Sequence, residues 1–289
     1  MTRPTPGQSQ WLFSDQELLF PPSCIVPDRP QDRLTRSQDK FGRAKAVQRI
    51  WHIRDALQIP LLPVASAAVF MHRFYMRQTM QQWDTNVVAT AALFLASKVE
   101  ERSKSLRHFI QACLEFSRDV GRARDLYLSQ PHSTSVPTLD ERDPSFKDLK
   151  ARVLKCEEVM LNTLCFDLEV QHAFPIVVKV VEKHWRHNPA LGTDVARVAW
   201  QFVTDSLPST LMLRHRPQVV AAAAIVGACV HLDTDLPLKP WSLLSEAERT
   251  KIENERTEEG EDFEPEPYWL ETLTVEPEDV VGKSLLCFY

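Results

Sequence analysis

The chain has 289 residues, a formal net charge of −5 and only seven glycines. The acidic balance argues against binding of nucleic acid through a basic surface, and the scarcity of glycine argues against glycine-rich phosphate loops and tight β-hairpins. Six cysteines are scattered without a CxxC pair, so we expect free thiols and no metal site.

Residues 1–36 are rich in proline and predict an extended arm. Six large apolar side chains interrupt it: Trp11, Leu12, Phe13, Leu18, Leu19 and Phe20. We expect these side chains to fix the arm to the globule, because they are too apolar for a solvated segment. Ser14 and Glu17 have the spacing of a capping box, which predicts a short helix.

Residues 40–59 predict a helix that Pro60 ends. Its apolar stripe consists of Ala46, Ile50, Ile53 and Leu57. Its other face carries Arg43, Lys45, Arg49 and Arg54. Such a face is typical of a solvated surface, and a basic docking surface is the alternative.

A second helix is predicted from Pro63 to about Arg77. His72 lies within its apolar pattern, and we interpret it as a hydrogen-bonded core histidine rather than a ligand. Residues 87–101 predict a third helix that is apolar on every side up to Ala96, which indicates the central helix of a bundle.

The third helix is shorter than the about 20 residues that span a bilayer. Its charged residues gather at the C-terminal end, as Lys98, Glu100 and Glu101. We therefore expect a buried helix whose tip serves as a docking point.

A fourth helix is predicted over 106–116, and the polar, proline-containing residues 117–145 predict a long surface loop. Residues 146–164 predict a fifth helix. Its apolar stripe consists of Leu149, Val153, Cys156, Met160 and Leu164.

The pattern then restarts, with helices predicted over 174–185, 193–207 and 216–231. The stretch N-V-V-A-T-A-A-L-F-L-A-S (86–97) aligns without a gap to Q-V-V-A-A-A-A-I-V-G-A-C (218–229). A repeat of this length predicts two similar all-α domains rather than a solenoid.

These patterns divide the chain into an arm (1–36), a first domain (37–170) and a second domain (171–289). The second domain contains an acidic insertion at 246–279, and a closing helix is predicted over 277–289.

Catalytic motifs are missing from the sequence. His184 and His187 lack the glutamate and the spacing of a zinc-protease site. The adjacent carboxylates Glu100–Glu101 and Glu157–Glu158 point about 100° apart on a helix, which makes neither pair an acid–base dyad. We expect no catalytic residue, no cofactor and no membrane segment, and the N-terminus lacks the apolar region of a signal peptide.

Two motifs, M-H-R-F-Y-M (71–76) and A-L-F-L-A-S-K-V-E-E (92–101), resemble those of a cyclin. The arm led by Trp11, L-K-C-E-E-V-M-L-N-T-L-C-F-D-L (154–168) and A-W-Q-F-V-T-D-S-L (199–207) resemble transcriptional cyclins of the K and T type. This group includes the fungal beta subunits of the RNA polymerase II C-terminal domain kinase. The resemblance implies an all-α fold of two tandem five-helix cyclin boxes with an N-terminal extended arm.

In this family a lysine ending the third helix and a glutamate in the fifth contact the αC helix of the kinase. The resemblance implies these kinase-binding roles for Lys98 and Glu157. The positions that usually line the same interface correspond to Val99, Glu100, Leu161, Phe166 and Leu168. On spacing alone, an internal salt bridge between two helices of one box is the alternative for Lys98 and Glu157.

Two features depart from cell-cycle cyclins. Many of those proteins join their first two helices by an Arg–Asp pair, whereas here Arg43 faces His72, which accepts a hydrogen bond more weakly. The Met and Trp of their substrate-docking groove correspond to Gly42 and Arg49. The resemblance therefore implies that this apolar groove is missing and that the face with Arg49 is solvated or basic.

The resemblance implies a non-catalytic activator of a transcriptional cyclin-dependent kinase. That kinase would phosphorylate the RNA polymerase II C-terminal domain and promote transcription elongation, which implies a nuclear location. We expect the partner to be the αC helix of the kinase. A third subunit is a further possible partner, and residues 246–279 are the candidate contact for it. We expect no direct contact with DNA or membrane. The alternatives are a TFIIB-like general transcription factor of the same fold and a helical peptide-binding scaffold of the retinoblastoma pocket type.

Overall fold

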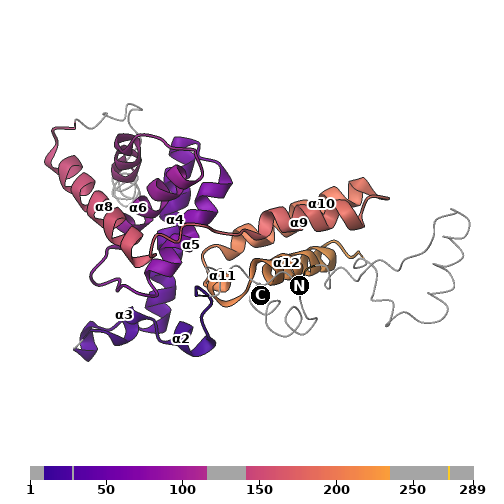
Figure 1. Ribbon diagram of the computed structural model, residues 1–289, viewed down its shortest axis with the longest axis horizontal. Coiled ribbons are helices and arrows are strands. Elements are labelled where there is room, and N and C mark those ends of the chain that lie inside the picture. The colour runs from indigo at the N-terminus through magenta and orange to yellow at the C-terminus, as the bar shows by residue number, and fades with distance from the viewer. Residues whose placement is uncertain (1–9, 28, 116–140, 235–272, 274–289) are drawn as a thin grey trace, which may run out of the picture. The chain divides into compact units, whose positions relative to one another are not determined.

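The computed structural model describes residues 10–27, 29–115, 141–234 and 273, and these residues form helices and turns without a β-strand (Figure 1). The all-α prediction is confirmed for this part of the chain. The chain divides into two compact units, one of which runs to Val170 and also includes Leu207–Arg214. The other contains Gln171–Ser206 and the residues from His215 onward. None of the described helices has the length and hydropathy needed to cross a membrane.

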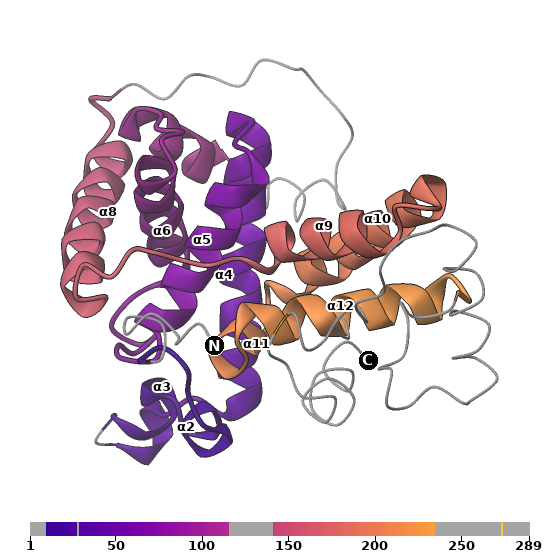
Figure 2. The same ribbon diagram turned by 45° about the vertical axis from the view of Figure 1, so that its right-hand side comes forward.

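The first unit is built around α6 (Thr85–Val99), whose residues from Val87 to Ser97 are all buried. It packs against three helices: α4 (Arg36–Leu57), α5 (Leu61–Phe74) and α8 (Pro144–Thr163). Both ribbon views show α6 enclosed by these helices (Figures 1 and 2). The prediction of a central helix is therefore confirmed, since a helix without a polar face is stable only where neighbours cover every side.

Shorter elements complete this unit. They are α2 (Asp15–Leu19), α3 (Pro22–Ile25), the 3₁₀ turn η1 (Pro30–Asp32), the helical residues 106–115 and α11 (Leu211–Arg214). The predicted capping box is confirmed, because the Ser14 side chain accepts from the backbone N–H of Glu17 and the Glu17 carboxylate accepts from the backbone N–H of Ser14.

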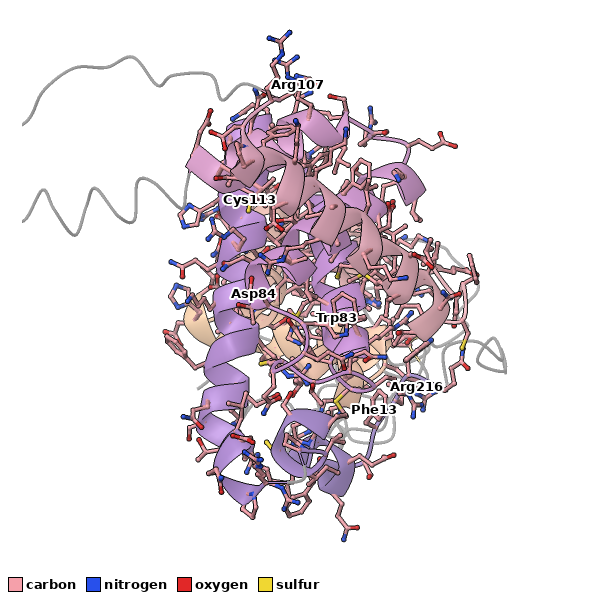
Figure 3. The ribbon with its side chains drawn as sticks, turned by 90° about the vertical axis from the view of Figure 1, so that its left-hand side faces the viewer. Phe13, Trp83, Asp84, Arg107, Cys113 and Arg216 are labelled. Atoms are coloured by element: carbon pink, nitrogen blue, oxygen red, sulfur yellow. The ribbon has the colours of Figure 1, made fainter. Side chains whose placement is uncertain are left out.

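Helix boundaries differ from the predicted ones where a cap decides them. A second capping box, formed by Thr35 and Gln38, starts α4 at Arg36, four positions before the apolar stripe led us to expect it. The Asp84 carboxylate caps α6 by accepting from the backbone N–H groups of Asn86 and Val87, at the position shown in Figure 3. Pro63 lies in the first turn of α5, where a missing N–H costs no hydrogen bond.

The N-terminal arm is anchored as predicted, but by fewer side chains. Trp11 and Phe13 are buried, and the backbone N–H of Phe13 donates to the carbonyl of Leu213 at 2.8 Å. The prediction was wrong for Phe20, which is 61% exposed.

The prediction of a solvated basic face on α4 was wrong for two of its four cations. Arg43 is buried, and its guanidinium donates to Asp39 Oδ2 at 2.8 Å and to the backbone carbonyls of His72 and Tyr75, each at 3.1 Å. Arg49 is buried and donates twice to Asn86 Oδ1, at 3.1 and 2.9 Å. The long aliphatic part of each arginine lets its guanidinium reach between the helices. There its N–H donors bind the oxygen acceptors of neighbouring residues.

His72 is a buried core histidine, as predicted. Its Nε2 lies 2.9 Å from the carbonyl of Leu207, which makes Nε2 the protonated nitrogen, and its Nδ1 lies 3.5 Å from Arg43 Nη1. Burial, and then the charge of Arg43, lower the pKa of His72 to about 3. The neutral ring therefore joins α5 to the segment before α11.

The second unit repeats part of this design. It contains α9 (Ala173–His184), α10 (Pro189–Ser206) and α12 (Pro217–His231). Helix α12 is buried from Val219 to Cys229, which matches its sequence likeness to α6. At Gly227 an added Cβ would lie 3.3 Å from the Phe202 ring, so the glycine lets α10 approach α12 closely. The predicted loop was wrong at its end, because α8 begins at Pro144. Residues 117–140 of that loop, the acidic insertion apart from Leu273, and the closing helix lie outside the described residues.

We expect Arg43→Met to lower the free energy of unfolding by about 3–5 kcal/mol, because the buried Asp39 carboxyl group would lose its cationic partner. Urea denaturation measures this loss. Lys45→Met on the exposed face of the same helix is the control and should change the value by less than about 0.5 kcal/mol. A loss below about 1 kcal/mol for Arg43→Met would contradict the network described here.

The depressed pKa of His72 predicts a stability that falls in acid. An unfolded histidine gains its proton near pH 6.5, whereas the folded one stays neutral down to about pH 3, so its contribution is complete above pH 6.5 and lost as the pH falls. Between pH 7.5 and 5 the lost stability amounts to about 2 kcal/mol. Urea titrations at several pH values should show a flatter profile for His72→Gln than for the wild type.

Candidate functional site

The C-terminal end of α6 and the middle of α8 meet in an ion pair. Lys98 Nζ lies 2.7 Å from Glu157 Oε1, and the two side chains are 42% and 11% exposed. The pair joins residues 59 positions apart in sequence. The bundle brings Lys98 and Glu157 together because α6 and α8 pack along each other.

Two contacts set the orientation of Lys98. Its ammonium group donates to Glu157 and lies 3.8 Å from the ring centroid of Phe94, one turn earlier on α6. Such a cation–π contact is worth roughly 0.5–1 kcal/mol at a half-exposed position. An ammonium group has three donors, so the exposed side of Lys98 retains hydrogen atoms for an acceptor on another protein.

Exposed or half-buried apolar side chains occur at the end of α6, on α8 and in the turn after α8. Val99 is 37% exposed and Phe166, just after α8, is 67% exposed, while Leu161 and Leu168 are half-buried. Large apolar groups at such exposure, on the elements that also carry an oriented charge, are typical of a protein-binding surface.

Leu154 is a further candidate that sequence reasoning missed. It is 43% exposed, and it lies seven residues, or about two turns, before Leu161 on α8. The two side chains therefore share a face of the helix. A leucine that lies off the buried stripe of Val153 and Cys156 was the sequence signal that pointed to it.

Glu100 is held from within the unit. Its carboxylate accepts from Ser66 Oγ at 2.6 Å. Beyond it, Glu101 adopts a positive φ of 53°, and Arg102 N–H donates to the Ser97 carbonyl at 2.8 Å. The positive φ of Glu101 and the bond from Arg102 to Ser97 are those of a Schellman motif, which ends α6 directly after Lys98 and Val99.

Helix α8 ends in a turn that holds Phe166 in an unfavourable conformation. Cys165 and Phe166 have φ values of 52° and 57°, and Asp167 N–H donates to the Leu164 carbonyl at 2.9 Å. Two successive positive φ values are those of a type I′ turn, for which Asn and Gly are strongly preferred. The left-handed region costs a residue with a Cβ roughly 1–2 kcal/mol.

The chemistry of this surface is that of recognition. Within the described ranges, no group of three or more His, Cys, Asp or Glu side chains is placed to hold a metal ion. The site instead combines an oriented cation, a partly shielded carboxylate and apolar side chains at two helix ends, which suits a helix or loop of another protein.

A protein-family model described as "Cyclin, N-terminal domain" matches residues 11–169, more than half of the chain. Among curated proteins, the chain is 28% identical over 274 residues to Cyclin pch1 of Schizosaccharomyces pombe, covering 95% of this chain and 66% of that protein. It is 32% identical over 233 residues to Cyclin-T1-5 of Arabidopsis thaliana, covering 79% of this chain and 36% of that protein. The chain thus spans less than two thirds of the length of each of these relatives.

Two solved structures share the fold. The yeast RNA Pol II CTD kinase CTDK-1 complex contains a chain that matches with a TM-score of 0.56 and 15% identity, covering 93% of this chain and 90% of that one. The CAK complex of Chaetomium thermophilum bound to ATP-gamma-S contains another, with a TM-score of 0.56 and 18% identity, covering 80% of this chain and 69% of that one.

We expect Cys165→Gly to raise the free energy of unfolding by about 1 kcal/mol, because glycine adopts a positive φ without the Cβ clash. Urea denaturation at neutral pH measures the change. Asn162→Gly, in the last turn of α8, is the matched control and should instead destabilise the chain by a few tenths of a kcal/mol. Equal losses for both variants would show that the turn is unstrained.

Proposed function

The chain belongs to the cyclin family, and we propose that it is the activating subunit of a transcriptional cyclin-dependent kinase. In this proposal the kinase phosphorylates the RNA polymerase II C-terminal domain and promotes transcription elongation. The chain contributes no catalytic group, and phosphoryl transfer takes place on the partner kinase. Because that substrate belongs to nuclear transcription, we place the chain in the nucleus.

The geometry at the ends of α6 and α8 is the observation that carries this proposal. Lys98 and Glu157 are held in mutual contact, yet Lys98 remains 42% exposed, and α6 and the turn after α8 also expose Val99 and Phe166. An internal salt bridge alone requires no exposed phenylalanine in the turn that follows its helix. The relatives Cyclin pch1 and Cyclin-T1-5 support the choice of kinase class. The fold that this protein shares with a chain of the CTDK-1 complex agrees with that choice.

In the proposed mechanism, this surface packs against the αC helix of the kinase and holds it inward. Lys98 and Glu157 hydrogen-bond to the helix backbone while Phe166, Leu161, Leu154 and Leu168 cover its apolar side. The inward position lets the αC glutamate pair with the lysine that orients ATP, which phosphoryl transfer requires. The cyclin shifts the kinase population only as far as it binds the inward state more tightly.

The TFIIB-like alternative is weaker than the sequence suggested. Arg43 and Arg49 are buried and bonded within the unit, so the face of α4 offers DNA two cations fewer than the sequence predicted. The net charge of −5 also opposes attraction to the phosphate backbone.

A charge swap separates docking from an internal salt bridge. Lys98→Glu combined with Glu157→Lys preserves an ion pair between α6 and α8, so the free energy of unfolding should change by less than about 1 kcal/mol. Affinity for the kinase should fall at least about tenfold, since each charge then opposes its partner group. The kinase is obtained by affinity purification with the chain from its native cells, and a synthetic polymerase C-terminal repeat peptide reports its activity.

The control swaps an ion pair in the other unit, by Asp194→Arg with Arg197→Asp, whose side chains are 54% and 71% exposed. This variant should bind and activate the kinase as the wild type does. Undiminished binding and activation by the Lys98/Glu157 swap would refute the docking role.

A further inference from the structure

Three side chains, those of Gln10, Trp11 and Arg73, donate hydrogen bonds to Asp167, which follows Phe166. Trp11 Nε1 donates to Asp167 Oδ2 at 2.9 Å, and Gln10 Nε2 donates to the same oxygen at 2.7 Å. Arg73 Nη1, from α5, donates to the backbone carbonyl of Asp167 at 3.4 Å. The Arg73 guanidinium also lies 5.1 Å from the centroid of the Trp11 ring.

Trp11 and Arg73 are shielded from water, whereas Asp167 is half-buried. Trp11 and Arg73 are 4% and 5% exposed, and no hydrogen-bond partner for Arg73 Nε occurs in the part of the chain that the structure describes. Burial lowers the pKa of Arg73 to about 10, while the negative charge of Asp167 raises it, so the guanidinium stays charged at neutral pH. A buried cation is stable only beside groups that offset the loss of its hydration. The Trp11 ring and Asp167 are such groups for Arg73.

Asp167 is the last residue of the strained turn. The hydrogen bond from its N–H to Leu164 closes that turn, and Leu168 N–H donates back to the Phe166 carbonyl at 3.1 Å. Cys165 and Phe166 do not favour their left-handed conformation by themselves, so long-range contacts must hold it. The contacts at Asp167 come from residues 94 and 156 positions away.

We propose that the N-terminal arm, through Trp11, and α5, through Arg73, together clamp Asp167 and thereby present Phe166 and Leu168 for kinase binding. Trp11, Arg73 and Asp167 are positioning residues in this scheme, since they act on the turn and leave the contact with the kinase to Phe166. The inference rests on the proposed function, because it concerns the same surface. Holding an anchor in its bound conformation before association strengthens binding by removing an ordering cost.

The first test is amide hydrogen exchange on the free chain. Trp11→Phe keeps an aromatic ring beside Arg73 but removes the donor to Asp167. We expect the amides of Cys165, Phe166 and Asp167 to exchange about tenfold faster, with no comparable change in α6. Trp83→Phe is the matched control, because among the described residues Trp83 Nε1 has no hydrogen-bond partner, and it should leave exchange in the turn within about twofold.

The second test measures affinity for the co-purified kinase and uses a rescue. Trp11→Phe should weaken binding about tenfold, or about 1.4 kcal/mol. Adding Cys165→Gly to Trp11→Phe should restore most of the affinity, because glycine favours the turn without help from the arm.

The outcomes separate the two proposals. Unchanged exchange in Trp11→Phe overturns the clamp, whatever the kinase does. Weaker binding that Cys165→Gly fails to restore also overturns it, because the arm would then contact the kinase directly. A wild-type chain that binds no cyclin-dependent kinase contradicts the proposed function, while the exchange measurement still decides whether Trp11 holds the turn.

Discussion

The complete burial of α6 is the constraint on which the rest of the first unit depends. From Val87 to Ser97 the helix has no solvated side, so α4, α5 and α8 must surround it. That enclosure also determines where the helix emerges. Lys98 is the first residue of α6 outside the core, and it emerges against α8, where Glu157 meets it. The packing of an apolar helix thus positions a charged pair.

Buried cations connect the helices of this unit more than we expected from an acidic chain. Arg43 bonds to Asp39 and to two carbonyl groups at the end of α5, and Arg49 bonds to Asn86 at the start of α6. These bonds join α4 to both of its neighbours. Charges removed from water stabilise a fold only when their hydrogen bonds are satisfied. Arg43 and Arg49 therefore connect helices within the unit and do not form part of an exposed basic surface.

The proposed kinase-binding surface combines rigid and strained parts. Lys98 and Glu157 stand on long helices and hold each other, whereas Phe166 stands on a turn with two positive φ values. Strain of this kind persists only where surrounding contacts over-determine it. The buried Trp11 and Arg73 supply such contacts at Asp167. The arm therefore belongs to the organisation of the site although it lies far away in sequence.

The sequence by itself determined the helices, because apolar spacing and caps such as Ser14–Glu17 are local signals. It also identified α6 as central from its lack of a polar face, and its motifs pointed to Lys98 and Glu157 through family resemblance. Only the tertiary structure decided that Arg43 and Arg49 are buried, since a helical pattern defines a face but not the neighbours that cover it. The same holds for the turn at Cys165 and Phe166. Neither residue favours a positive φ, and the contacts that stabilise this turn come from segments that only folding brings together.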